Sequence, residues 1–323
     1  MPSLSLQKIN NYLDRLIPVT TPLAVFLGLL FPAFFSPLRP YVLWLFGIMT
    51  FSGALKLTAS ELGAAVRSPV PIALFFFAAH VLMPLAALFS SSLFFKNPDI
   101  IAGFILLFAG PTAVSGFIWV MIFRGDKALG LTFILLDTLL APLVVPATLS
   151  VLMGAKVEMD MSGIAVSLLF MVVIPTIAGV AINEISKGKV PQKICAGLDP
   201  LAKICLFTVI AANSSAIAPF VKLNNPVIWH TAFLCIFLTS SGFLLAWLFG
   251  VIGKCGGEKR ASLIIAGGLR NNSAVMTIAV TFFPEQTVIP TLVSIIFQQI
   301  IAAVMGKLII ERQTRTLEQN HQE

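Results

Sequence analysis

The sequence predicts an all-α polytopic membrane protein of ten transmembrane helices, built as two inverted repeats of five helices each. Three observations lead to this fold class. Hydrophobic residues make up 58% of the 323 residues and charged residues only 11%, whereas soluble globular domains carry ~25% charged residues. The mean hydropathy is +0.96. Ten apolar segments follow one another along the chain, each near the ~20 residues that a membrane-spanning helix needs.

Short polar gaps separate these segments. Several segments contain proline, for example Pro84, Pro111 and Pro142, which membrane helices tolerate because neighbouring helices satisfy the freed backbone groups. The expected helices, numbered one to ten in chain order, cover residues 17–36, 40–57, 70–93, 100–123, 128–152, 162–182, 198–220, 227–252, 261–283 and 287–310.

The basic residues between the segments predict the orientation of the chain. Sixteen Lys and Arg residues fall on one side of the membrane and four on the other, the four being Arg39, Lys96, Lys156 and Lys222. By the positive-inside rule, the first side and both chain termini are cytoplasmic. These loops account for the formal charge of +7, so we expect no nucleic-acid partner.

An internal repeat supports the division into halves. A shift of 157 residues places Ile17-Pro18 on Ile174-Pro175 and Gly110 on Gly267, and the second match joins the fourth helix to the ninth. Since five helices per half is an odd number, the second half enters the membrane in the opposite orientation, as in many transporters. The first repeat is expected at residues 1–156 and the second at residues 157–323.

The fourth and ninth helices carry Gly, Pro and amide residues at mid-membrane depth. The sequence of 108–116 is FAGPTAVSG, and that of 266–274 is AGGLRNNSA. Paired interruptions at corresponding positions indicate a transport site, because broken helices expose backbone dipoles that bind anions or polar solutes. The alternative is a pair of kinked helices packed through small residues. The candidate substrate-binding residues are Thr112, Ser115, Gly116, Arg270, Asn271, Asn272 and Ser273.

Three ionisable side chains fall within the expected helices, namely His80, Asp137 and Arg270. A charge at the centre of a membrane helix costs ~2.5–3.5 kcal/mol on insertion scales and usually marks a functional site. These residues are candidates for coupling or for replacing a cation. Asp137 is the expected partner of Arg270, in a structural salt bridge beside a neutral His80. The other interpretation is that His80 and Asp137 carry a coupling proton.

No metal site or cofactor is expected. The four cysteines, Cys195, Cys205, Cys235 and Cys255, have neither metal-ligand nor CxxC spacing. An intramembrane enzyme would need a nucleophile with a base or a set of metal ligands, and one His and one Asp on separate helices offer little of either. A receptor role stays open at this point.

Several short motifs, in order, resemble the bile acid:sodium symporter family, including its bacterial members. The resemblance implies a core domain of helices three to five and eight to ten, and a panel domain of helices one, two, six and seven. It also implies that helices four and nine are broken and cross, and that the protein lies in the bacterial inner membrane and takes up organic anions with sodium. The motifs are MTFSGALKL at 49–57, LMP at 82–84, GP at 110–111, TLLAPLVVP at 138–146, VIPTIAG at 173–179 and NS at 272–273.

The chain departs from the family where the resemblance would place sodium ligands. The family's oxygen-bearing side chains fall on Gly116 and Phe117 in the fourth helix, on Gly130 and Ile134 in the fifth, and on Gly267 in the ninth. No Glu lies anywhere within residues 261–283. The guanidinium of Arg270 is therefore expected to take the place of the missing cation.

The predicted function is secondary transport of a small organic anion by alternating access, with altered or absent sodium coupling, either proton-coupled or facilitated. An ordinary sodium-coupled symporter is the first alternative, and an intramembrane enzyme or a receptor is the alternative from another class. The expected partners are the anion and the lipid bilayer. The oligomeric state is left open, with a monomer among the alternatives.

Overall fold

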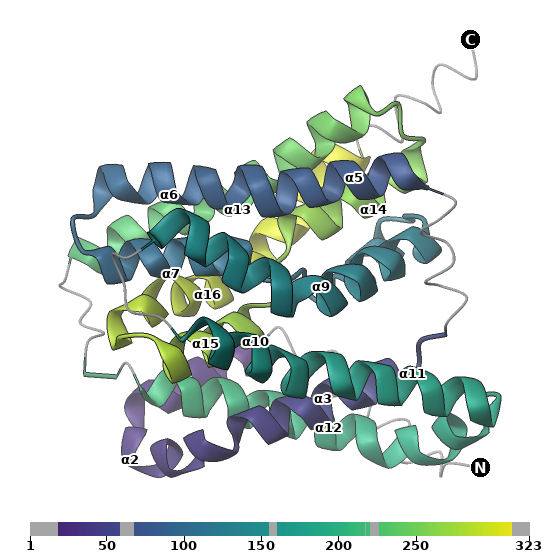
Figure 1. The fold of residues 1–323 in the computed structure, drawn as a ribbon, viewed down its shortest axis with the longest axis horizontal. Helices are drawn as coiled ribbons and strands as arrows, with labels where there is room; N and C mark the ends of the chain where they lie inside the picture. Colours follow the sequence, from purple (N-terminus) through teal and green to yellow (C-terminus); the bar gives the residue numbers. More distant parts are fainter. Residues whose placement is uncertain (1–18, 59–67, 155–159, 217, 220–225, 312–323) are drawn as a thin grey trace.

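A computed structural model describes residues 19–58, 68–154, 160–216, 218–219 and 226–311. Within these ranges the regular secondary structure is helical, and the one extended pairing is an isolated bridge between Thr112 and Arg270. The prediction of an all-α protein is confirmed (Figure 1).

The helices follow one another with few long connections. Among them, η3, η5 and η7 are π-helical turns, and η1 and η6 are 3₁₀ turns. After a first helix at Val19–Leu30, the order is α2 (Pro32–Phe35), η1 (Ser36–Tyr41), α3 (Val42–Ala54), α5 (Pro69–Phe77), η3 (Ala78–Leu82), α6 (Met83–Phe94), α7 (Pro98–Ala109), α8 (Gly116–Ile122), α9 (Lys127–Met153), α10 (Met161–Leu168), η5 (Leu169–Val173), α11 (Ile174–Ser186), α12 (Lys189–Ser215), α13 (Pro226–Ile252), α14 (Gly257–Gly268), α15 (Asn272–Phe282), η6 (Glu285–Val288), α16 (Ile289–Met305) and η7 (Gly306–Glu311).

In the described part of the chain, six helices are long and apolar enough to cross a membrane, or seven if one bent pair counts as a single span. The protein is therefore a multi-pass membrane protein. The six match the expected third, fifth, sixth, seventh, eighth and tenth helices: Pro69–Phe94, Lys127–Met153, Met161–Ser186, Lys193–Ser215, Pro226–Ile252 and Glu285–Ile310.

The boundary between the first two expected helices differs from the prediction. The chain bends by 101° between Val19–Leu30 and Pro32–Ala54, so the turn lies at Phe31 and not at 37–39. Pro32 explains the position, because proline restricts the residue before it and stands well at the start of a helix. The segment predicted to be the turn is instead the 3₁₀ helix η1.

The fourth and ninth expected helices are both interrupted. Between α7 and α8 the segment 110–115 is not helical, and between α14 and α15 the segment 269–271 is not helical. The Gly, Pro and amide residues that predicted these breaks thus lie at the breaks.

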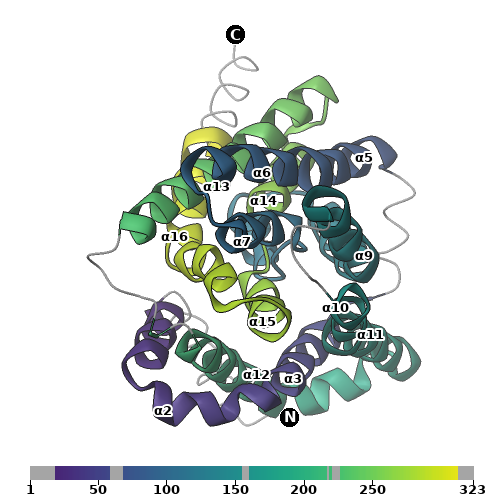
Figure 2. The same ribbon diagram turned by 60° about the vertical axis from the view of Figure 1, so that its left-hand side comes forward.

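The helices form two groups that Figures 1 and 2 show from different sides. In both views α2, α3, α11 and α12 lie together, and α5, α6, α13, α14, α7 and α16 lie together opposite them. Contacts support the grouping, since α3 packs on α11 and α12, and α13 packs on α14 and α16. The groups meet through α15, which touches α12, and through α10, which touches α9 and α15.

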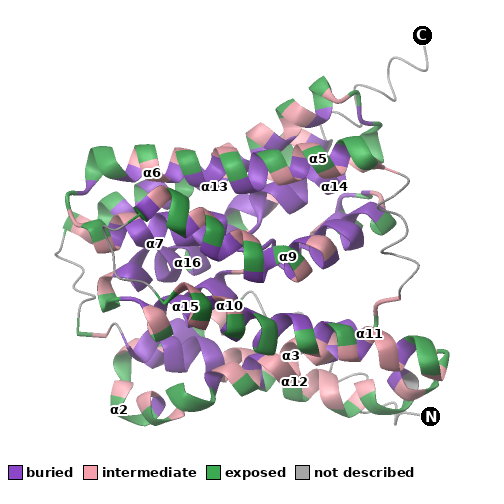
Figure 3. Ribbon diagram, viewed as in Figure 1, coloured by how far each residue is buried: buried purple, intermediate pink, exposed green. Residues whose placement is uncertain are grey.

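The buried residues concentrate inside the second group. Nearly all of α7 from Ile100 onward is buried, as is α14 from Ala261 onward (Figure 3). Many large apolar side chains face outward instead, among them Phe34, Trp44 and Leu143. An apolar exterior of this kind is the surface that lipid solvates.

Small residues let the helices of this group approach closely. A Cβ atom added at Gly268 would collide with the ring of Phe243, and one added at Gly103 would collide with the carbonyl oxygen of Thr287. The close approach of α14 to α13 and of α7 to η6 therefore depends on these two glycines.

Candidate functional site

The two interrupted segments lie against each other. Thr112 and Arg270 form an antiparallel bridge, and the N–H of Asn271 donates to the carbonyl of Pro111 at 2.8 Å. The hydroxyl of Thr112 donates to the carbonyls of Ala266 at 2.9 Å and Leu269 at 3.1 Å. These bonds satisfy backbone groups that the breaks leave without helical partners, so the contact of the two breaks is a structural necessity as well as a candidate site.

Arg270 stands at this contact with most of its guanidinium unpaired. The residue is 2% exposed. Its Nη2 donates to the carbonyl of Ala79 at 3.4 Å, while Nε and Nη1 have no hydrogen-bond partner. A buried unpaired cation is costly, and free N–H groups of a guanidinium are donors that suit a carboxylate.

Gln298 of α16 holds the backbone of Arg270 in place. Its Oε1 accepts from the N–H of Arg270 at 3.1 Å, and its Nε2 donates to the carbonyl of Arg270 at 2.9 Å. Both backbone groups of a non-helical residue are thus satisfied by one amide side chain. The guanidinium consequently projects from a fixed main chain.

Asp137 does not form the expected ion pair with Arg270. One carboxylate oxygen accepts the N–H of Thr112 at 2.7 Å, and the other lies 2.7 Å from Nε2 of His80. His80 belongs to the π-helical turn η3, a feature that changes which way the residues of a helix point and is frequent at functional sites. Asp137 and Arg270 still attract each other electrostatically, but not through a direct contact.

Some of the other predicted residues use their polar atoms in hydrogen bonds within the fold, and others keep polar atoms without a partner. Asn271 caps α15 by accepting the N–H of Ala274 at 3.2 Å. Asn272 is buried and donates to the hydroxyl of Ser294 at 3.1 Å, while its Oδ1 has no partner. Gly116 is buried where α8 begins, Ser115 is exposed, and Ser273 is half-buried. Arg270 and Asn272 therefore offer unsatisfied polar atoms, and Thr112 and Asn271 are committed to the fold.

Sequence reasoning missed Ser294 and the carbonyl of Ala79 as partners. Ser294 precedes Gln298 by one helical turn, so their shared face was a usable signal. The carbonyl of Ala79 could not be inferred, because no residue type marks which backbone oxygen faces a neighbour.

A hydrogen bond also joins the two helix groups near the site. Asn213 of α12 donates to the hydroxyl of Thr277 of α15 at 3.0 Å, and both residues are buried. The neighbouring hydroxyl of Ser214 is buried without a partner.

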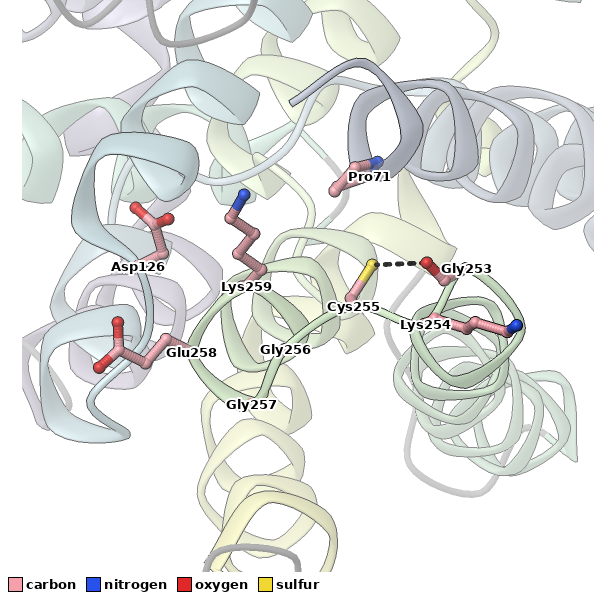
Figure 4. Close-up of a pocket in the computed structure, with 9 residues that line it drawn as sticks. All are labelled: Pro71, Asp126, Gly253, Lys254, Cys255, Gly256, Gly257, Glu258 and Lys259. Atoms are coloured by element: carbon pink, nitrogen blue, oxygen red, sulfur yellow. Dashed lines mark hydrogen bonds between the residues drawn. The ribbon is translucent and has the colours of Figure 1, made fainter. Parts of the chain in front are cut away.

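A separate pocket of about 520 Å³ opens at the first turn of α14 (Figure 4). Figure 4 shows the carboxylates of Asp126 and Glu258 on one side and Cys255 and Lys254 on the other. Burial raises the pKa of the Cys255 thiol, and the nearby Arg260 and Lys259 oppose that shift. The pocket lies at the opposite end of α14 from Arg270, so it does not belong to the contact of the two breaks. Its lining is Pro71, Asp126, Gly253, Lys254, Cys255, Gly256, Gly257, Glu258 and Lys259.

Comparisons with known proteins give similarities over most of the chain. The sequence model of the sodium bile acid symporter family matches residues 42–222. The chain is 40% identical to the uncharacterized protein YbaS of Bacillus subtilis, over 91% of this chain and 96% of that protein. It is 21% identical to the uncharacterized sodium-dependent transporter YocS of the same organism, over 93% and 92%. It is 26% identical to the probable sodium/metabolite cotransporter BASS1, chloroplastic, of Arabidopsis thaliana, over 92% and 74%.

Proposed function

Because the chain belongs to the sodium bile acid symporter family, it is a membrane transporter and not an enzyme, and we propose that it is a secondary carrier of a small organic anion. Membership of this family excludes the alternative of an intramembrane enzyme. What we propose beyond family membership is the class of substrate and the ion to which its transport is coupled.

The observation that carries the proposal is the buried guanidinium of Arg270, whose Nε and Nη1 lack partners at the contact of two broken helices. A carboxylate accepts charge-assisted hydrogen bonds from free N–H groups of this kind. The same contact would cancel the charge that makes the empty site costly. Asn272, with its unpartnered Oδ1, would meet a hydroxyl or other donor on the substrate.

We assign transport to alternating access between the two helix groups. In this proposal the ten spans form inverted repeats at 1–156 and 157–323, with α5–α9 and α13–α16 as the core and the remaining helices as the panel. The separate packing of α3, α11 and α12 supports it. So does the restriction of contacts between the groups largely to α9, α10 and α15. The basic residues between the spans, together with the bacterial relatives, support an inner membrane location with both termini cytoplasmic.

Sodium coupling is proposed to be altered or absent. Gly116, Gly130 and Gly267 have no side-chain oxygen to offer a cation, and Ile134 and Phe117 have none either. A fixed guanidinium at the same contact repels sodium. Arg270 would thus supply permanently the positive charge that a sodium ion supplies on each cycle.

An ordinary sodium-coupled symporter is the second candidate. The printed names of YocS and BASS1 call those relatives sodium-dependent or sodium cotransporters, and the unpartnered Oδ1 of Asn272 is a hard oxygen that a cation could use.

Uptake into proteoliposomes distinguishes the two candidates. Potassium salts of pyruvate, lactate, succinate and cholate are offered with sodium chloride or with choline chloride at equal ionic strength. We expect saturable uptake of at least one anion without sodium, its loss in Arg270→Ala, and retention in the exposed-site control Arg39→Ala. Strict sodium dependence would contradict cation replacement, and absence of saturable uptake in every salt would contradict the carrier function itself.

A further inference from the structure

The buried ionisable groups of the site are balanced in charge when no anion is bound. Apart from thiols, the buried ionisable side chains of the described residues are His80, Asp137 and Arg270. One carboxylate and one guanidinium sum to zero, provided that His80 is neutral. In a low-dielectric interior, a net charge is far more costly than a balanced set.

A monovalent anion bound by Arg270 would change this balance to minus one. The smallest correction is one added proton, and histidine is the one residue type of the three that commonly accepts a proton near neutral pH. We infer that His80 takes up one proton with each monovalent anion, so that the carrier is an electroneutral proton–anion symporter. This inference rests on the proposed function.

The geometry around His80 suits an acceptor of this kind. Its Nε2 lies 2.7 Å from Oδ1 of Asp137, an ion-pair distance at which the angles do not make a hydrogen bond, and its Nδ1 is likewise buried without a hydrogen-bond partner. A proton added to the ring gives an imidazolium that Asp137 stabilises directly. The proton comes from the aqueous phase on one side and returns to the aqueous phase on the other, so no bond besides N–H forms or breaks.

The elements packed around η3 contain few other ionisable groups that could take up the proton in place of His80. Asp137 from α9 faces His80, and the rings of Phe75 and Phe76 lie beside it. Arg270, from the break before α15, reaches the same turn at the carbonyl of Ala79. The other ionisable residues of α9, α7 and α13 are Lys127, Asp99, His230 and Cys235, and those at the start of α14 are Glu258, Lys259 and Arg260. Of these, Cys235 is a neutral buried thiol that donates a hydrogen bond to the carbonyl of Pro290, and the rest lie at helix ends.

The link between proton and anion is reciprocal. Arg270 donates to the carbonyl of Ala79, the residue before His80, so an anion on the guanidinium acts on the imidazole across a short distance. An anion that favours protonation of His80 is itself bound more tightly when His80 is protonated. Asp137 would transmit the change to the fourth helix, because its second oxygen holds the N–H of Thr112.

Proton uptake during transport tests the inference. Proteoliposomes that contain the pH dye pyranine are clamped electrically with potassium and valinomycin, kept sodium-free, and given the potassium salts used above. Protein-free liposomes correct for anions that cross as free acids. We expect about one proton to enter per monovalent anion, an uptake rate that does not depend on the imposed potential, and loss of the proton flux in His80→Gln. His230, which is exposed near the start of α13, supplies the matched control His230→Gln, which should behave as wild type.

Anion uptake by the wild type without proton entry would overturn the inference and leave the proposed carrier function intact. A failure of the proposed carrier function can also be told apart from a failure of this inference. If none of the anions is carried, the proposed function fails, and NMR of histidine-labelled protein with His230→Gln and His321→Gln judges the proton site alone. An imidazole of His80 that does not titrate between pH ~4 and ~9, or that titrates identically in Asp137→Asn, would overturn it.

Discussion

The carboxylate of Asp137 accepts the backbone N–H of Thr112 at 2.7 Å, so a side chain from the continuous helix α9 supports the break between α7 and α8. The N–H is one of the groups that a broken helix leaves unpaired. The support is charged and fully buried, with Asp137 0% exposed. A substitution there acts on the fold and on the charge balance together.

Asp137→Ala should therefore destabilise the protein strongly. It leaves the N–H of Thr112 without its acceptor and the charge of Arg270 without a nearby anion, and breaking a buried charge set of this kind costs about 3–5 kcal/mol. Asp137→Asn keeps an acceptor oxygen and should cost less. Thermal unfolding in detergent measures both, with the exposed Glu258→Gln as control. Equal melting temperatures for Asp137→Ala and the control would refute the role assigned to the carboxylate.

Gln298 and its neighbour Gln299 form a natural pair for comparison. Gln298→Ala orphans the buried N–H of Arg270, at about 1–3 kcal/mol, and removes one of the two donors to the Arg270 carbonyl, which keeps the N–H of Asn272 at 2.9 Å. Gln299→Ala removes one acceptor of the half-buried Trp119 Nε1, which water can replace. We expect the melting temperature to fall further for Gln298→Ala. The opposite order would show that the backbone of Arg270 does not depend on this amide.

The breaks were predictable from sequence because their cause is local. Gly110-Pro111 and the run from Gly267 to Asn272 contain residues that cannot continue a helix cheaply in lipid. The partner of Asp137 was not predictable, since it depends on the π-helical turn that directs His80 toward α9. Neither the composition nor the hydrophobic periodicity of residues 78–82 predicts that π-helical turn. The early turn at Phe31 was missed for a related reason, because two further prolines, Pro37 and Pro40, marked an equally reasonable boundary.

Gly268 and Gly53 differ in whether the fold has room for a side chain at their position. Gly268→Ala places a methyl group against the ring of Phe243, and overpacking of this kind costs about 1–3 kcal/mol. Gly53 in α3 has no neighbouring atom near an added Cβ, so Gly53→Ala should raise stability by roughly 0.5–1 kcal/mol, the helix preference of Ala over Gly. Thermal unfolding of the two variants should shift in opposite directions. A stabilising Gly268→Ala would contradict the close packing of α14 on α13.

The start of α10 should lose stability in acid. Asp160 caps this helix by accepting from the N–H of Gly163 and the hydroxyl of Ser162, and these bonds lower its pKa. A carboxyl whose pKa is lower in the folded state stabilises the fold above its unfolded pKa of about 3.9, and this contribution disappears as the pH falls through the folded value. Asp160→Asn keeps a capping oxygen but does not titrate. The difference in melting temperature between the two proteins should therefore narrow from pH 6 toward pH 3. A constant difference would show that the cap is independent of ionisation.

The hydrogen bond between Asn213 and Thr277 should open and close during transport. It joins α12 to α15 at 3.0 Å, and these helices belong to the groups that alternating access requires to separate. We expect Asn213→Cys with Thr277→Cys, placed in a chain whose four native cysteines are replaced by serine, to be inactivated by a short thiol cross-linker and restored by reductant. Each single cysteine variant should be insensitive to the reagent. Because a covalent tie cannot be released by thermal motion, full transport by a completely cross-linked protein would mean that α12 and α15 stay together throughout the cycle. The boundary between the moving groups would then have to lie elsewhere.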